Sequence, residues 1–192
     1  MNQLYEKLHE NRVIESERLV LRPVELEDAQ AMNQYASDPD TTYFVFSTHK
    51  DLAQTKHDLA FYFLKEPLGK YAIVEKETNQ MIGTIDYHSI NEAIKSAELG
   101  YTLHKDYWGK GYMTEACRTL ITVGFEQIGF NYLCAMHDLR NPASGRVMEK
   151  SGLQYLGVLP YHRIDNKDPL RPVDDAYYHL TKEDYFASVE QP

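Results

Sequence analysis

The run from Glu98 to Ala116 contains the residues best suited to hold an anion next to reacting groups. An apolar stretch is followed by a polar break, a turn flanked by Gly109 and Gly111, and the start of a helix. Free backbone N–H groups and the positive end of a helix dipole meet at such a point, and both suit a pyrophosphate. Glycine matters because a backbone can approach a phosphate closely only where no Cβ intervenes.

The turn alone is a moderate signal, because two glycines between a strand and a helix are more often structural. It lacks the third glycine of the dinucleotide-binding pattern. It also lacks the Gly-Lys-Ser/Thr ending of a P-loop, since Met113 and Thr114 follow the second glycine. A second segment is therefore needed to assign a ligand.

That second segment lies about thirty residues further on, from Asn141 to Leu153. Asn141 closes a strand-like run, and Pro142 stands where the first turn of a helix tolerates proline. Gly152 suits the position just past the end of that helix. Taken alone, Asn141 would be interpreted as an ordinary helix cap.

Together, the Tyr-Trp-Gly-Lys-Gly-Tyr-Met-Thr-Glu-Ala run and the Asn-x-x-Ser-x-x-Val-x-Glu-Lys-x-Gly run resemble the acetyl-CoA-binding motifs of the GNAT superfamily of N-acetyltransferases. The branch they resemble is the Rim-type one, which includes ribosomal-protein N-terminal acetyltransferases. The resemblance extends from Glu17 to Tyr185. It implies a mixed α/β (α+β) fold, the GNAT fold, with a central, mostly antiparallel, splayed sheet and helices on both faces.

The resemblance also implies acetyl-CoA as co-substrate and assigns residues to it. Backbone N–H groups of the turn would hold the pyrophosphate, and the strand before it would lie beside the pantetheine arm. Family members often have Gln or Arg where Trp108 stands, and Gly or Ala where Met113 stands, so side-chain contacts differ here while the backbone cradle remains. The residues implied to bind the cofactor are Leu99, Gly100, Tyr101, Thr102, Leu103, Trp108, Gly109, Lys110, Gly111, Tyr112, Met113, Thr114, Asn141 and Ser144.

The catalytic groups are harder to assign. Many family members place a tyrosine acid at about the position of Met148, which cannot donate a proton. Ser144 is the nearest replacement, with Tyr101 and water as alternatives. Glu98 is the candidate base because it borders the cofactor strand, although an exposed strand carboxylate explains it equally well.

The acceptor would be a primary amine that attacks the thioester directly in a ternary complex. An α-amine has an unperturbed pKa of about 7.7–8.0, against about 10.4 for lysine, so a carboxylate acting through water would suffice as base. The acceptor is interpreted as a protein N-terminal α-amine. A small amine, either a polyamine or an aminoglycoside, is the alternative acceptor. Side chains that could face it, or else belong to the surface or core, are Tyr43, Phe46, Asp86, Tyr87, His88, Asp174 and Asp175.

Two readings without catalysis also remain. A non-catalytic acyl-CoA sensor would explain the missing tyrosine acid. A structural protein with a simple phosphate-binding turn is opposed by the Asn141 segment, since an anion site needs no second motif.

The elements that must position these residues follow from periodicity. Alternation predicts strands at 19–23, 71–74, 81–87, 97–103, 132–136, 153–159 and 176–180, with 77–80 as a hairpin turn. Helical spacing predicts helices at 25–35, 52–64, from Tyr112 to Gly129, and after Asn141. Thr181 and Asp184 predict the cap of a short final helix, while 41–46 has no assignment and 165–172 is a polar loop.

Composition sets the remaining limits. The 192 residues suit one N-acetyltransferase domain, 1–192, with a core of about 16–187. A net charge of −9 without a basic cluster disfavours nucleic-acid binding. The chain shows no membrane-length apolar run, signal peptide or metal-ligand spacing, so we expect a cytoplasmic protein without membrane or metal partners. Cys117 and Cys134 should be reduced thiols, and exposed strand edges leave a homodimer possible.

Overall fold

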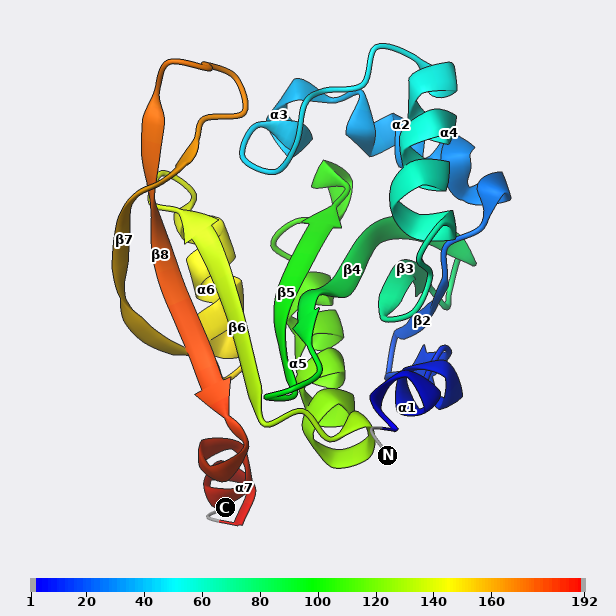
Figure 1. Ribbon diagram of the computed structural model, residues 1–192. Coiled ribbons are helices and arrows are strands. Elements are labelled where there is room, and N and C mark those ends of the chain that lie inside the picture. The colour runs from blue at the N-terminus through cyan, green and yellow to red at the C-terminus, as the bar shows by residue number, and fades with distance from the viewer. Residues whose placement is uncertain (1–2, 191–192) are drawn as a thin grey trace.

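An eight-stranded sheet forms the centre of the protein (Figure 1), which a computed structural model describes for residues 3–190. The strand order is β1-β2-β3-β4-β5-β6-β8-β7, and every neighbouring pair is antiparallel except β5 and β6. The strands are β1 Ile14–Glu15, β2 Leu19–Pro23, β3 Lys70–Glu75, β4 Gln80–Asn91, β5 Ser96–Leu103, β6 Tyr132–Asp138, β7 Gln154–Ile164 and β8 Pro172–Thr181.

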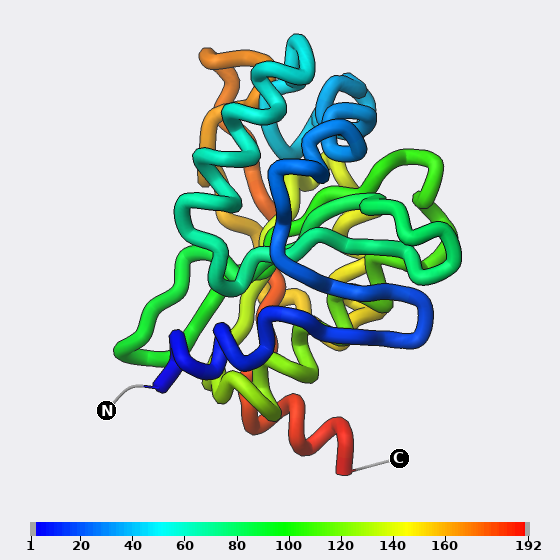
Figure 2. The backbone as a smooth tube through the Cα atoms, turned by 90° about the vertical axis from the view of Figure 1, so that its right-hand side faces the viewer, coloured from blue at the N-terminus to red at the C-terminus, as the bar shows by residue number. Residues whose placement is uncertain are grey.

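Helices cover both faces of this sheet, as expected. The α-helices are α1 Leu4–Glu10, α2 Ala29–Ala36, α3 Pro39–Thr42, α4 Leu52–Leu59, α5 Tyr112–Val123, α6 Pro142–Lys150 and α7 Lys182–Glu190. Short 3₁₀ turns lie at Leu26–Asp28 (η1) and Lys105–Tyr107 (η3), and π-helical turns at Ala60–Leu64 (η2) and Gly124–Ile128 (η4) extend α4 and α5. Figures 1 and 2 show α1 and α7 at the end of the molecule opposite α2 and α4.

The sheet opens between β5 and β6. These two strands pair in parallel only where Ser96–Glu98 faces Tyr132–Cys134. Beyond that point β5 continues alongside β4, β6 continues alongside β8, and the two strands diverge (Figure 1). The sequence-based expectation of a splayed, mostly antiparallel sheet is confirmed. Residues 99–103 therefore have a strand partner on one side only.

Two separate cores hold the helices in place. The larger core packs α1, α5, α6 and α7 against one face of the sheet, and its members include Leu99, Cys117 and Leu120. The smaller core packs α2 and α4 against β2, β3 and β4 on the other face, with Met32 and Leu59 among its members. A helical layer therefore covers each face of the sheet at β4. The two layers pack on the sheet through different sets of core residues.

The predicted elements are present, but the short strand β1 was not predicted, and β4 continues to Asn91 although the predicted strand ended at residue 87. α3, which was not predicted, begins at Pro39, where the Asp38 carboxylate accepts a hydrogen bond from the Asp40 N–H (2.8 Å) and caps the helix. β7 and β8 extend further than predicted, since their hairpin continues to the bond from Asp165 N–H to Arg171 C=O (2.8 Å). α1 was not predicted, although Leu4 and Leu8 on it are buried in the larger core.

Across residues 3–190, no helix combines the length and apolar character that crossing a bilayer requires. In the same residues, no group of three or more His, Cys, Asp or Glu side chains is arranged to hold a metal ion. Cys117 is buried and Cys134 partly buried, and both are free thiols.

Candidate active site

A first cavity of about 420 Å³, called cavity 1 below, lies where β5, the turn before α5, and α6 meet. It lies on the α5 and α6 side of the opening between β5 and β6. Its lining residues are Asp40, Thr41, Phe44, Val45, Tyr101, Thr102, Leu103, Tyr107, Trp108, Gly109, Gly111, Tyr112, Met113, Thr114, Asn141, Ala143, Ser144, Arg146, Val147 and Lys150. The two sequence segments singled out by their motifs thus face one another across a single space.

The glycine turn has the geometry that its sequence indicated. Gly109 and Gly111 have φ angles of +71° and +83°, a region that residues with a Cβ adopt at a cost. A Cβ at Gly109 would meet nothing within 4 Å, so the turn presents open backbone on that side. The Trp108 indole N–H donates to the Leu103 carbonyl oxygen (2.7 Å), which holds the turn against the end of β5.

Arg18 supports the same turn from a distant part of the chain. Its guanidinium donates to the Lys110 carbonyl oxygen (3.0 Å) and pairs with the Glu115 carboxylate (2.6 Å). It also lies over the Tyr112 ring, 4.3 Å from the ring centre, and the Tyr112 hydroxyl donates to the Glu75 carboxylate. The turn and the first residues of α5 are therefore fixed by side chains before any ligand arrives.

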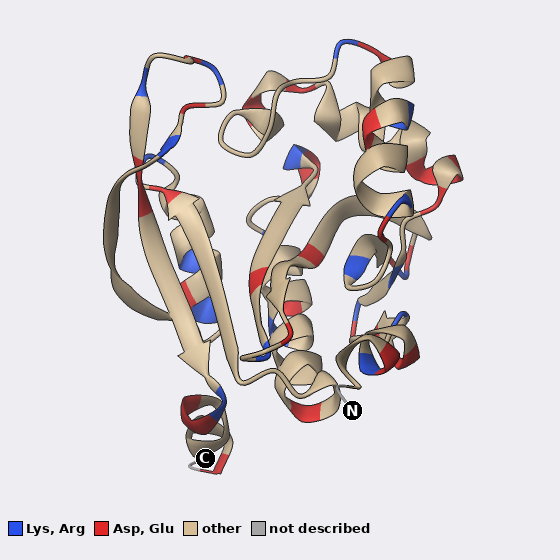
Figure 3. Ribbon diagram, in the orientation of Figure 1, with Lys and Arg blue, Asp and Glu red and all other residues tan. Residues whose placement is uncertain are grey.

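The start of α5 is suited to an anion. Gly111 is the N-cap and makes no side-chain capping bond, so the first N–H groups of the helix remain available at the cavity wall. Arg146 and Lys150 line the same cavity from α6, which carries blue segments in Figure 3. Two cations on one wall stand out in a chain with a net charge of −9 and favour a negatively charged ligand here.

Two hydroxyl groups meet across cavity 1. The Tyr101 hydroxyl, from β5, lies 2.9 Å from the Ser144 Oγ and donates to the Ser144 carbonyl oxygen (3.1 Å) on α6. Burial raises the pKa of Tyr101 above its usual range, so its proton stays in place near neutral pH. Asn141 caps α6 through its side-chain oxygen, and Met148 is buried in the larger core. Met148, at the position where many family members have a tyrosine, does not line cavity 1, whereas Tyr101 and Ser144 do.

A second cavity of about 500 Å³, called cavity 2, lies on the opposite face of the sheet, under α2 and α4. Its walls come from five parts of the chain, and most of its wall residues are apolar or aromatic. The lining residues are Met32, Tyr35, Val45, Phe46, Ser47, His49, Gln54, Asp58, Leu59, Phe61, Tyr62, Phe63, Thr84, Asp86, His88, Gly100, Tyr101 and Thr102. Val45, Tyr101 and Thr102 line both cavities, so the two spaces meet beside β5.

Strand alternation decides which side chains reach cavity 2. Asp86 pairs in register with Gly100, and His88 with Glu98, so these four residues share one face of β4 and β5. A Cβ at Gly100 would lie 2.9 Å from the Asp86 carboxylate oxygen and from a carbon of the His88 ring. Glycine at this position therefore leaves room for the two side chains to meet over β5.

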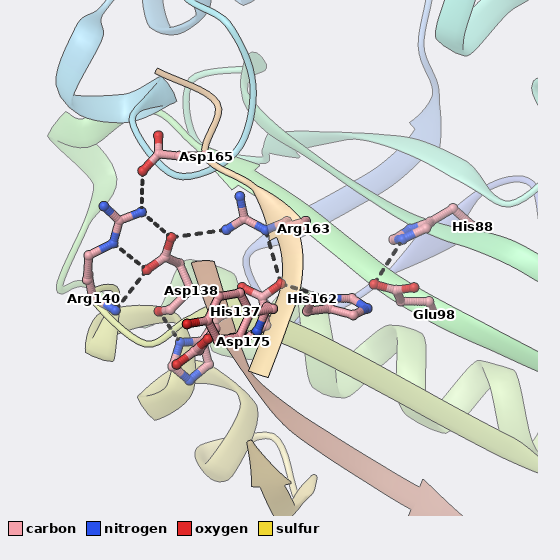
Figure 4. A network of polar contacts seen from close by, with 11 residues as sticks. His88, Glu98, His137, Asp138, Arg140, His162, Arg163, Asp165 and Asp175 are labelled. Carbon is pink, nitrogen blue, oxygen red and sulfur yellow. Dashed lines mark hydrogen bonds and ion pairs between the residues drawn. The ribbon is translucent and has the colours of Figure 1, made fainter. Parts of the chain in front are cut away.

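The polar floor of cavity 2 is a carboxylate–imidazole–carboxylate cluster. His88 Nδ1 lies 3.0 Å from Asp86 Oδ1, and His88 Nε2 lies 3.3 Å from Glu98 Oε1, a contact visible in Figure 4. The Tyr62 hydroxyl donates to Asp86 Oδ2 (2.8 Å). Burial, the largest influence, lowers the pKa of His88, but hydrogen bonds to the two carboxylates outweigh it and raise that pKa to about 9. At neutral pH, two carboxylates and one imidazolium leave this cluster with one net negative charge.

A second histidine of cavity 2 behaves in the opposite way. His49 Nδ1 lies 2.9 Å from the Thr55 hydroxyl, and Nε2 lies 3.3 Å from the Asp58 carboxylate. Burial lowers the pKa of His49 despite the nearby Asp58. The wall under α4 is therefore neutral at His49, and Asp58, whose side chain is 41% exposed, stands at its outer edge.

An ionic network holds the end of β6 next to cavity 1. Arg140 pairs with Asp138 (2.5 Å) and Asp165 (2.7 Å), and Arg163 pairs with Asp138 (3.1 Å) and Asp175 (3.0 Å) (Figure 4). Asp138 also closes the turn that leads into α6, through a bond to the Arg140 backbone N–H (2.9 Å). The network thus fixes the position from which α6 starts.

The predicted site residues divide by location. Tyr101–Leu103, Trp108, Gly109, Gly111–Thr114, Asn141 and Ser144 line cavity 1. Leu99 is buried in the larger core, Gly100 lines cavity 2, and Lys110 contributes its carbonyl oxygen to Arg18. Glu98 contacts His88 and lines neither cavity.

The candidate acceptor-facing residues divide as well. Phe46, Asp86 and His88 line cavity 2, whereas Tyr87 points to the opposite face and is buried in the larger core. Tyr43, Asp174 and Asp175 line neither cavity. Asp175 instead belongs to the ionic network beside β6.

Sequence reasoning missed the supporting residues Arg18, Tyr62 and His49. Arg18 contacts the carboxylate of Glu115, 97 positions away, and Tyr62 contacts that of Asp86, 24 positions away. No local spacing in the sequence could therefore predict either contact. One usable signal was present: Thr84, Asp86 and His88 alternate along a strand, which is the pattern of one polar face.

Comparison with known proteins agrees with this arrangement. The family model described as acetyltransferase (GNAT) domain matches residues 18–154. A Bacillus licheniformis protein described as uncharacterized N-acetyltransferase p20 is 33% identical over 177 residues, covering 88% of this chain and 96% of its own length. The crystal structure of a GNAT-family acetyltransferase from Bacillus anthracis superposes with a TM-score of 0.80 at 24% identity, covering 89% and 99% of the two chains. The ribosomal-protein-S5-alanine acetyltransferase of Vibrio fischeri superposes with a TM-score of 0.74 at 21% identity, covering 90% and 98%.

Proposed function

The chain belongs to the GNAT family of N-acetyltransferases, and from this premise we propose that it transfers acetyl from acetyl-CoA in cavity 1 directly to a primary amine in cavity 2. The observation that carries the proposal is that the two cavities approach β5 from opposite faces and share Val45, Tyr101 and Thr102. Two reactants held in this way can react without a covalent enzyme intermediate, because each has its own cavity and the cavities meet beside β5.

The residues of cavity 1 fit a CoA thioester. The positive φ angles at Gly109 and Gly111 and the uncapped start of α5 make a backbone cradle for a pyrophosphate. Beyond the cradle, β5 has no strand partner over residues 99–103 on the side facing β6, so its backbone groups can bond an extended pantetheine arm. When bound, acetyl-CoA supplies a carbonyl carbon to which the amine nitrogen bonds as the C–S bond breaks.

The hydroxyl pair of Tyr101 and Ser144 is the proton donor in this proposal. The sulfur that leaves needs a proton, and the raised pKa of Tyr101 keeps its hydroxyl protonated until one is needed. Ser144, 2.9 Å away, either donates directly or passes the proton on from Tyr101.

The floor cluster of cavity 2 is the proton acceptor. An amine arrives as an ammonium ion and must lose a proton before it attacks. Asp86 faces the cavity, while Glu98 contacts only the far side of His88, so Glu98 acts through His88. Because His88 is protonated below about pH 9, the carboxylates receive the proton, directly or through water.

A protein N-terminal α-amine is the acceptor we propose. A Bacillus subtilis relative, YdaF, carries a provisional name as a ribosomal N-acetyltransferase, and it is 36% identical over 72 residues that cover 38% of this chain. An α-amine also loses its proton more readily than a lysine side chain, so it needs only the modest help that a carboxylate cluster gives.

Calorimetric titration with acetyl-CoA, desulfo-CoA and NAD tests the cofactor half of the proposal. We expect micromolar binding of the two CoA species and none of NAD. Turnover is then measured as thiol release with an alanine-initiated peptide and with spermidine. CoA binding without transfer to any amine would contradict the enzyme proposal and favour an acyl-CoA sensor, and failure to bind CoA would contradict both.

A further inference from the structure

Cavity 2 combines apolar walls with a single buried anionic floor. Met32, Tyr35 and Leu59 are each less than 5% exposed, and Phe46 and Phe63 complete the wall. The floor carries the buried carboxylate of Asp86, which is 7% exposed, while Ser47 and Gln54 add polar groups elsewhere in the lining. A ligand held against the five apolar and aromatic side chains therefore meets mainly carbon there and a carboxylate at the floor.

The carboxylate of Asp86 still has room for a cation. It accepts one hydrogen bond on each oxygen, from His88 on Oδ1 and from Tyr62 on Oδ2. An ionised carboxylate offers about four lone-pair sites, so two remain. The second N–H of His88 points to Glu98, so the two carboxylates and one imidazolium of the cluster keep one uncompensated negative charge.

The walls restrict what may be attached to that cation. A hydroxyl or a second ammonium group placed against Met32, Leu59 or Phe63 would be desolvated without a partner, which is costly. A hydrocarbon group in the same place would bury apolar surface, worth about 25 cal/mol per Å². Asp58, the other acid of the cavity, stands at the outer edge, where its side chain is 41% exposed and lies 3.3 Å from the neutral His49 ring and 3.0 Å from His57.

We infer that cavity 2 selects a singly charged primary amine whose neighbouring carbon carries an apolar or aromatic group, with Asp86 as the anchor for the ammonium ion. This inference rests on the proposed function and narrows its acceptor. Polyamines and aminoglycosides are disfavoured by the walls. The same chemistry is offered by a free arylalkylamine and by a polypeptide that begins with an apolar residue.

Phe61 and Tyr62 mark where a longer acceptor would leave the cavity. Both line cavity 2 from the π-helical turn after α4, and their side chains are 65% and 41% exposed. A polypeptide acceptor would place its second and third residues there. A free amine needs no contact with these residues, so they distinguish the two sources.

Binding measurements test the inference separately from catalysis. The full-length protein, saturated with desulfo-CoA, is titrated calorimetrically with phenethylamine, spermidine and kanamycin, and with two peptides that differ only in beginning with Phe or Ser. We expect phenethylamine and the Phe peptide to bind at least tenfold more tightly than the other three ligands. Tighter binding of spermidine, kanamycin or the Ser peptide would overturn the inference.

Turnover with acetyl-CoA on the same five ligands then tests the proposed function alone. Binding in the expected order without acetyl transfer would sink the transfer proposal and leave the cavity's selectivity standing. A Phe61→Ala variant distinguishes free amines from polypeptides as acceptors. If polypeptides are the acceptors, the variant should bind the Phe peptide more weakly and phenethylamine as tightly as wild type does. Equal binding of the peptide to wild type and variant assigns the cavity to free amines.

An Asp86→Asn variant tests the anchor. We expect phenethylamine to bind at least tenfold more weakly, while the neutral analogue 2-phenylethanol binds as before. Glu10→Gln, which changes an exposed carboxylate on α1, is the matched control and should alter neither affinity. If the variant lost affinity for the amine and for the alcohol equally, Asp86 would have only a structural role, and its assignment as the ammonium anchor would be wrong. If Asp86→Asn does not fold, the ligand series on the wild-type protein still decides.

Discussion

Cavity 1 and cavity 2 meet at β5, but cavity 1 is formed mainly by backbone groups and cavity 2 mainly by side chains. Cavity 1 depends on backbone, namely a turn with two positive φ angles, an uncapped helix start and an unpaired strand edge. Cavity 2 depends on side chains from α2, α4 and its π-helical turn, the segment at 45–49, and the two strands β4 and β5. A site built from backbone depends on the fold itself, whereas a site built from side chains can change by substitution at little cost to the fold.

The largest expected effect comes from Gly111→Asp in cavity 1. The substitution forces a side chain into φ +83°, places a Cβ 3.4 Å from the Arg18 guanidinium, and adds a negative charge beside the proposed pyrophosphate cradle. We expect acetyl-CoA to bind at least a hundredfold more weakly by calorimetry, with amine binding to cavity 2 unchanged.

Gly129→Asp is the matched control for that variant. Gly129 has a comparable φ of +88°, and a Cβ there meets nothing within 4 Å. The control should therefore show the same backbone strain, about 1–2 kcal/mol, without loss of CoA affinity. If both variants lost CoA affinity equally, the turn would have no special role.

Removing the hydroxyls should separate chemistry from binding within cavity 1. Tyr101→Phe and Ser144→Ala are each expected to lower kcat about tenfold to hundredfold, with the Kd for acetyl-CoA within twofold of wild type. The double variant should be little worse than either single one, because the two hydroxyls form one unit. Fully multiplicative losses, or an unchanged kcat, would contradict a shared proton donor.

His88 in cavity 2 is expected to make the stability of the protein depend on pH. The pKa of His88 is about 9 in the folded protein and about 6.5 when unfolded, so its contribution is complete below pH 6.5 and is lost as pH rises through 9. The groups facing it are Asp86 and Glu98, with Tyr62 beyond. At pH 6 the free energy of unfolding of the wild type should be about 2 kcal/mol larger than that of His88→Gln. This difference should become smaller as the pH rises toward about 9.5. A gap independent of pH would show that His88 is not held as a cation.

The smallest effect is expected for Arg18→Met, which removes a side-chain support from the backbone cradle. Arg18 is 40% exposed and fixes the turn through the Lys110 carbonyl oxygen. We expect acetyl-CoA affinity to fall about fivefold, since exposed ion pairs contribute little and the backbone itself remains. Lys7→Met removes an equally exposed cation that forms an ion pair on α1, and it should have no effect on CoA binding.

Much of cavity 1 could be predicted from sequence because its signals are local. Gly109, Gly111 and Asn141 each stand at a backbone conformation that only a few residue types adopt well. The residue type at such a position therefore indicates the local conformation without any information from distant parts of the chain. The strands and helices that carry them were predicted by periodicity for the same reason. Boundaries were less accurate where the partner decides the length, as in the β7–β8 hairpin.

The sequence by itself thus determined the family, the splayed sheet and the place of the glycine turn. Tertiary structure alone decided that Glu98 contacts His88 and lines neither cavity, that Tyr101 meets Ser144 across the opening in the sheet, and that Arg18 supports the turn. The physical reason is distance along the chain. Backbone preferences act within a few residues, whereas the charge and apolar surface of a cavity are sums over side chains that only folding brings together.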